Sequence, residues 1–156
     1  MMRRSDREIT DPGTIHAIVR ACQVCRVGLA VEGEPYVVPV SFGFDGGAVY
    51  FHTARHGRKI EMMTANPRVC LEFERGVELI TNPDDACSWT FRYESVIGFG
   101  AVVELVEEPA KSRGLNQIMR HYSGRDWSFD ARTLESTRVW RVDLDAVTGK
   151  RTEHKA

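Results

Sequence analysis

The sequence predicts one mainly β domain with peripheral helices. Six segments have the two-residue alternation or the short apolar runs of β-strands, and three have the spacing of amphipathic helices. Turn signals rich in glycine separate neighbouring strands, as in antiparallel hairpins. With 156 residues the chain can bury a real hydrophobic core, without disulfides or a structural metal.

Composition excludes several classes of protein. Apolar residues make up 42%, charged residues 28%, and the formal net charge is -1, which is typical of a globular protein and gives nucleic acid no electrostatic attraction. No run approaches the roughly 18 apolar residues that a membrane span needs. The charged N-terminus is followed by no apolar stretch before the turn at Asp11–Gly13, so we expect no signal peptide and a cytoplasmic protein.

The first predicted helix covers residues 11–25. Asp11 can cap it, and Pro12 suits its first position. Cys22 and Cys25 have the spacing of a zinc or redox motif, but no second pair or His-x-x-x-His partner completes a metal site. We therefore interpret both cysteines as small apolar residues on the buried face of this helix, and expect no metal.

The next segments predict two hairpins. Residues 26–32 and 35–44 form the first hairpin, and a turn at Asp45–Gly47 leads into a strand over residues 48–53. One face of the 35–44 strand is apolar, and the other carries Val37, Pro39, Ser41 and Gly43. A flat molecule could approach the backbone on that second face, although a surface facing solvent would have the same pattern.

The rest of the chain contains two helices and three more strands. Gly98 and Gly100 permit a barrel corner within the longest of these strands, and Gly124 can end the last helix. In order, we predict a helix over 58–66, a strand over 69–74, a polar loop over 75–87, a long or bent strand over 89–107, a helix over 109–122 that caps the barrel, a strand over 139–145, and a mobile tail from about 150 to 156.

The segment from Phe51 to Ile60 carries the clearest chemical signal. Arg58 and Lys59 fall in the first turn of a helix, where two cations cost a few tenths of a kcal/mol unless an anion is bound there. With free backbone N–H groups and the Thr53 hydroxyl they could cradle a phosphate, and Gly57 lets the chain bend around it. The alternative is a solvated basic patch, with the helix starting one or two residues elsewhere.

A family resemblance favours the phosphate. The runs 35–42, 50–53, 57–59 and 89–98 together resemble the pyridoxamine 5'-phosphate oxidase-like superfamily, and within it the nitroimidazole-resistance branch of proteins that bind flavin mononucleotide (FMN). The resemblance extends to about residue 150. It implies a six-stranded antiparallel split β-barrel, a homodimer, and two FMN sites in clefts between the subunits.

The resemblance also implies which residues bind FMN. A purely structural role is the alternative for His52, and Trp140 is interpreted as filling the barrel. His16, His56, His121 and His154 are expected at the surface. The implied contacts are Val40, Ser41 and Phe42 to the flavin ring through main-chain atoms, His52 and Thr53 at the ring edge, Arg58 and Lys59 to the phosphate, and Ser95 and Val96 from the partner subunit.

The implied function is that of an FMN-dependent oxidoreductase. Hydride from a nicotinamide donor would reduce the flavin, which would pass electrons to a small organic acceptor such as a nitro compound. No catalytic residue is assigned. The tail at residues 150–155 has no equivalent of the Arg-x-His substrate motif, so oxidation of a vitamin B6 phosphate is not expected. The alternatives are a non-catalytic flavin-storage or flavin-sensing protein, and the same fold holding a deazaflavin or haem.

Overall fold

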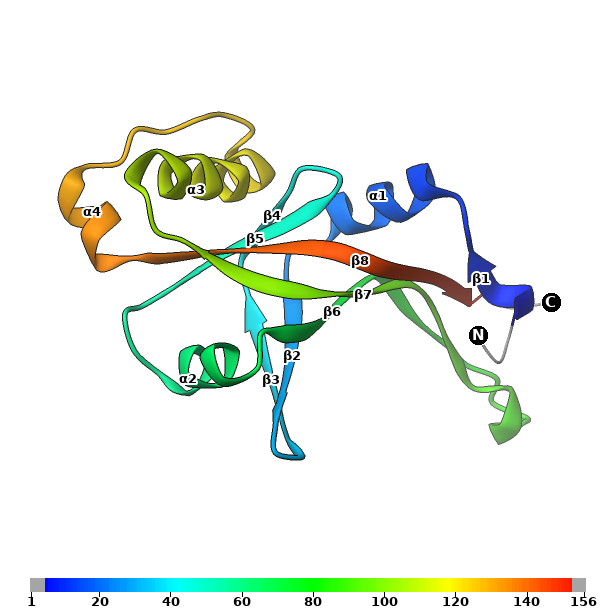
Figure 1. Cartoon of the computed structure of the whole chain (residues 1–156). Coiled ribbons are helices and arrows are strands. Elements are labelled where there is room, and N and C mark those ends of the chain that lie inside the picture. The colour runs from blue at the N-terminus through cyan, green and yellow to red at the C-terminus, as the bar shows by residue number, and fades with distance from the viewer. Residues whose placement is uncertain (1–4, 153–156) are drawn as a thin grey trace.

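The computed structural model of the chain describes residues 5–152 (Figure 1). Two short 3-10 helices, η1 and η2, accompany four α-helices and eight strands within this range. In chain order the elements are η1 (Ser5–Arg7), β1 (Glu8–Ile9), α1 (Pro12–Ala21), β2 (Cys25–Val31), β3 (Glu34–Val40), β4 (Phe42–Phe44), β5 (Ala48–Thr53), α2 (Arg58–Ala65), β6 (Arg68–Ile80), η2 (Ala86–Ser88), β7 (Thr90–Leu105), α3 (Glu108–Ser123), α4 (Ala131–Ser136) and β8 (Arg138–Thr152).

The strands form one curled antiparallel sheet. Its order is β3-β2-β6-β7-β8-β5-β4, with β1 paired to β8. Only Ser41 separates β3 from β4, although they stand at opposite ends of this order, so the sheet must curl to bring its two ends together. The mainly β prediction is confirmed. The strand number is eight rather than six, because the predicted strand 35–44 divides at Ser41 and β1 was not predicted.

The curled sheet encloses the main hydrophobic core. Phe42, Phe51 and Phe73 are fully buried there, with Trp140 at 4% exposure. This confirms Trp140 as a residue that fills the barrel. The predicted corner is also confirmed, since the β7–β8 register shifts between Phe99 and Gly100.

Helix α3 approaches β4 so closely at Gly43 that no side chain fits at this position. A Cβ atom added to Gly43 would lie 2.3 Å from the backbone carbon of Gln117 on α3. The prediction that Gly43 belongs to an open face is therefore wrong. Its face is covered by a helix that is distant in sequence, whereas Val37 is 63% exposed.

Two predicted irregular segments belong to strands instead. Residues 75–80 continue β6 and pair with β7 as far as Ile80↔Thr90, so the predicted loop is wrong over that range. Residues 150–152 pair with β7, and Thr152 is only 6% exposed, so they are not a mobile tail. Ladder hydrogen bonds to β7 hold both segments in the sheet. Residues 153–156, including His154, lie outside the described range.

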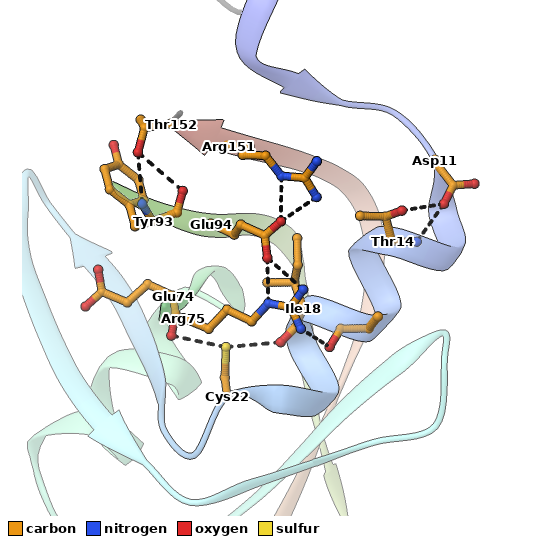
Figure 2. A network of polar contacts seen from close by, with 11 residues as sticks. Asp11, Thr14, Ile18, Cys22, Glu74, Arg75, Tyr93, Glu94, Arg151 and Thr152 are labelled. Carbon is orange, nitrogen blue, oxygen red and sulfur yellow. Dashed lines mark hydrogen bonds and ion pairs between the residues drawn. The ribbon is translucent and has the colours of Figure 1, made fainter. Parts of the chain in front are cut away.

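The first two cysteines are buried but do not share a helix. Helix α1 ends at Ala21, so the predicted helix is too long, and Cys25 lies on β2. The Cys22 thiol donates to the carbonyl oxygens of Ile18 (3.2 Å) and Glu74 (3.3 Å), which joins α1 to β6 (Figure 2). Burial raises the pKa of Cys22 to about 11 and also raises the pKa of Cys25, so both remain thiols.

Two kinds of feature are absent from residues 5–152. Within this range no group of three or more His, Cys, Asp or Glu side chains is placed to hold a metal ion. None of the helices described there is long and apolar enough to cross a membrane.

Candidate functional site

The turn from β5 into α2 has the geometry of an anion-binding site. Gly57, at φ +141°, takes a conformation that side chains disfavour, and α2 begins directly after it with Arg58 and Lys59. No side chain caps the helix, so its first N–H groups have no partner from a cap. The predicted placement of both cations in the first turn is confirmed, and with one acidic residue, Glu61, in the same turn a net positive charge lies at the positive helix end.

Two neighbouring strands supply further side chains to this helix end. The Arg58 guanidinium lies 4.7 Å from the ring centre of Tyr36 on β3, a cation–π contact that fixes its direction. On β5, partial desolvation and the charge of Lys59 lower the pKa of His52. The His52 ring is therefore neutral at pH 7, with one donor and one acceptor nitrogen. The structure thus gathers Arg58, Lys59 and His52 in one place, and adds Tyr36, which sequence reasoning had counted only among core residues.

Thr53 is turned away from this group. It is 4% exposed, and its hydroxyl donates to the Ala54 carbonyl (2.8 Å) and accepts from the Trp140 indole N–H (3.0 Å). Both contacts lie inside the protein. Only main-chain atoms of Thr53 are left for a ligand, because its hydroxyl is used to hold Trp140 in the core.

The break between β3 and β4 exposes a short length of backbone. Val40 and Phe42 are buried at 8% and 0% exposure, whereas Ser41 between them is exposed. The Phe42 N–H donates to the Tyr122 hydroxyl at 3.0 Å, so it is not free for a flavin. Of these three predicted ring contacts, Ser41 is the exposed residue, and it belongs to neither strand.

Ser95 and Val96 lie far from this group within one chain. Ser95 pairs with Lys150 on β8, whereas His52 pairs with Val139 on the same strand. Val139 and Lys150 are eleven positions apart on β8, which at 3.3 Å per residue amounts to roughly 35 Å of strand. A single chain therefore does not bring these residues to α2. The Val96 side chain is also fully buried, so it could offer only main-chain atoms.

Two features near the site were not predicted from sequence. A cleft of about 390 Å³ borders Gly57 and α2, and Arg55, His56 and Arg138 are among the residues that line it. His121, expected at the surface, is half-buried, with its ring 4.4 Å from that of Phe42. Neither had a local signal, because both depend on packing between distant segments.

The family is decided by comparison with known proteins. Residues 11–151 match the family model described as pyridoxamine 5'-phosphate oxidase. The chain belongs to this family. The resemblance drawn from sequence motifs is thereby confirmed, and it covers nearly all of the chain.

Solved structures of the pyridoxamine 5'-phosphate oxidase fold agree with this assignment. A protein of Bacteroides thetaiotaomicron, provisionally described as a 5-nitroimidazole antibiotic resistance protein, is 35% identical, with 92% of this chain and 86% of that chain covered and a TM-score of 0.82. The flavocytochrome Anf3 of Azotobacter vinelandii (22% identity, 98% and 72% covered) and an FAD- and haem-binding protein of Mycobacterium smegmatis (16%, 94% and 74%) both have TM-scores of 0.83. No curated protein matches the sequence.

Proposed function

We propose that this family member is a homodimeric FMN-binding flavoprotein with the split β-barrel of its family, acting as an oxidoreductase between a nicotinamide donor and a small organic acceptor. The observation that carries the proposal is the uncapped start of α2. There Arg58 and Lys59 lie near His52, with Glu61 as the acidic residue of the same turn and no ion pair to either cation among residues 5–152. A phosphate monoester turns this unfavourable arrangement into a favourable one.

The residues present fit FMN. A guanidinium fork, an ammonium group and unpaired helix N–H groups are the usual donors to a phosphate dianion. The exposed backbone at Ser41 offers main-chain atoms to the polar edge of a flat ring. Proteins of the same fold described as binding FAD, or FAD and haem, support a flavin or a related cofactor.

Bound FMN would supply the electron-transfer chemistry, and the chain would supply binding and orientation. Arg58 and Lys59 hold the phosphate. The main chain at Ser41 orients the ring, and the neutral His52 imidazole can donate or accept one hydrogen bond at its edge. No side chain of the described residues is assigned a proton-transfer step.

A homodimer is supported by two observations. The first is the separation of Ser95 and Val96 from the rest of the site, which a second chain would overcome. The second is the β6–β7 arm, residues 76–92, which projects from the sheet (Figure 1). Four large apolar side chains on it are about half exposed: Val77 (53%), Leu79 (49%), Trp89 (50%) and Phe91 (51%).

A two-stranded ribbon is marginally stable alone, so we propose that a second copy of the chain covers these side chains. Light scattering should give the mass of a dimer for the FMN complex. A monomer at micromolar concentration with FMN bound would contradict the proposed interface.

The phosphate assignment is tested by replacing both cations. The Arg58→Ala/Lys59→Ala variant loses two charge-assisted contacts, each worth about 1.5–3 kcal/mol, so its FMN affinity should fall at least about a hundredfold. The control Arg113→Ala/Arg132→Ala removes the same charge from exposed positions on α3 and α4 and should bind normally. The FMN affinity of the variant and of the control is measured by titrating the FMN-free proteins with FMN and following flavin fluorescence. Equal affinity of the first variant and wild type would refute the assignment.

The electron-transfer step is tested separately. The visible spectrum of the purified protein distinguishes FMN from a deazaflavin or haem, because each absorbs differently. Mixing the flavin-loaded protein with NADH or NADPH without oxygen should bleach the flavin band. Absence of bleaching with both donors would refute a nicotinamide donor and favour a storage or sensing role.

A further inference from the structure

The hydroxyl of Tyr122 lies between the ends of β2 and β3. It accepts a hydrogen bond from the Phe42 N–H at 3.0 Å and donates one to the Gln23 carbonyl at 2.7 Å. Tyr122 belongs to the last turn of α3, 80 residues from Phe42 along the chain. A side chain from a helix thus joins a backbone group of the α1–β2 connection to a backbone group of the sheet.

The strand register shows what this hydroxyl replaces. Strands β2 and β3 are antiparallel, and their ladder ends at the pair Cys25↔Val40. The same register continued by two residues places Gln23 opposite Phe42. Residues opposite each other in an antiparallel ladder can join N–H to carbonyl directly. Here the Tyr122 hydroxyl stands between those two groups, and from Phe42 onward the chain pairs with β5 instead.

The packing of α3 against β4 limits where Tyr122 can lie, although the Tyr122 side chain is itself 45% exposed. The approach of α3 to Gly43 leaves no room for a Cβ atom, so the helix cannot shift toward β4. The neighbouring His121 places its Nε2 atom 2.8 Å from the Cys22 carbonyl oxygen, on the same link between α1 and β2. Helix α3 therefore hydrogen-bonds to the backbone just before β2 and just after β3, and the Tyr122 hydroxyl is held where the two strands diverge.

We infer that Tyr122 is a positioning residue: its hydroxyl interrupts the β2–β3 ladder and so presents the backbone of Ser41 to the flavin. The inference rests on the proposed function, because the backbone that Tyr122 positions belongs to the proposed flavin site. Without the hydroxyl, the Phe42 N–H and the Gln23 carbonyl can bond to each other or to water. Either change moves Ser41, which follows the last ladder residue, Val40.

The experiment compares Tyr122→Phe with a matched control. Tyr50→Phe also loses one phenol hydrogen bond, to the Asp45 carboxylate at 2.8 Å, but that bond does not involve the strand ends. Two quantities are measured for each protein: the FMN dissociation constant, and the NMR carbon shifts of Ser41, which report its backbone angles. Tyr122→Phe should weaken FMN binding about tenfold and move the Ser41 shifts. Tyr50→Phe should leave the Ser41 shifts unchanged.

The outcomes separate this inference from the proposed function. If wild type binds FMN and Tyr122→Phe binds it equally with unchanged Ser41 shifts, the inference is overturned and the proposed function stands. If wild type does not bind FMN, the proposed function fails, and the Ser41 shifts alone decide whether Tyr122 sets the break. Should Tyr122→Phe not fold, fluorotyrosine at position 122 keeps the hydroxyl but weakens it as an acceptor. A smaller change in the same direction is then expected, and no change overturns the inference.

Discussion

Replacing Glu94 by glutamine should destabilise the protein in a way that depends on pH. The Glu94 carboxylate accepts hydrogen bonds from two arginines (Figure 2). The Nε and Nη2 atoms of Arg75 lie 2.7 Å and 2.6 Å from it. Those of Arg151 lie 2.7 Å and 2.5 Å from it. Arg75 also donates to the Ala17 carbonyl on α1. The Glu94→Gln change keeps the shape of this junction between β6, β7, β8 and α1 but removes its negative charge.

The size of the effect follows from burial. The Glu94 side chain is 18% exposed, while those of Arg75 and Arg151 are 32% and 44% exposed, so solvent screens part of each interaction. Charge-assisted hydrogen bonds are worth about 1.5–3 kcal/mol when buried, and we expect about 1–2 kcal/mol in total after screening. For a chain of this length that corresponds to a fall in Tm of roughly 3–6 °C at pH 7.

The sign of the pH dependence follows from the pKa of Glu94. Partial burial opposes ionisation, but the hydrogen bonds from Arg151 and Arg75 outweigh it and lower the pKa. A carboxylate with a lowered pKa in the folded state stabilises the fold above its unfolded pKa, about 4.3. This stabilisation is lost as the pH falls through the folded value. The difference between wild type and variant should therefore be full at pH 7 and disappear in strong acid.

Thermal unfolding of both proteins from pH 7 downward is the assay. Asp126→Asn is the matched control, since its partner Arg120 and Asp126 itself are both more than half exposed, and its Tm should equal that of wild type. The reasoning is refuted if Glu94→Gln unfolds at the wild-type temperature at pH 7. It is also refuted if the difference persists unchanged in strong acid.

Two further substitutions test the site. Lys59→Met should raise the pKa of His52, because the Lys59 charge helps to lower it. NMR titration of the His52 ring measures this pKa, and an unchanged value would contradict the proximity of Lys59 to His52. Thr53→Val should lower the free energy of unfolding by about 1–3 kcal/mol, because the buried Trp140 indole N–H loses its acceptor. FMN affinity should change far less than in the Arg58→Ala/Lys59→Ala variant, and a hundredfold loss would show that the Thr53 hydroxyl contacts the phosphate.

Local patterns predicted the elements whose causes are local. The start of α1 follows from Asp11, which accepts from the Thr14 N–H at 2.7 Å, and from Pro12 in its first turn. The end of α3 follows from Gly124, which has φ +72°. The start of α2 after Gly57 is of the same kind, and so the two cations of the candidate site could be placed from sequence.

Strand ends were harder to predict because their stability comes from partners far along the chain. Residues 76–80 belong to β6 and residues 150–152 belong to β8 because β7 hydrogen-bonds to both. The same strand pairing showed that a single chain cannot bring Ser95 to His52.

The sequence by itself determined the mainly β class, the family, and the basic first turn of α2, since each depends on residues close together or on an ordered set of motifs. Only the tertiary structure decided which groups in the site remain free. Thr53 faces Trp140, and the Phe42 N–H is taken by Tyr122, 80 residues later. Such pairs form when distant segments pack together, and neither residue type nor spacing encodes them.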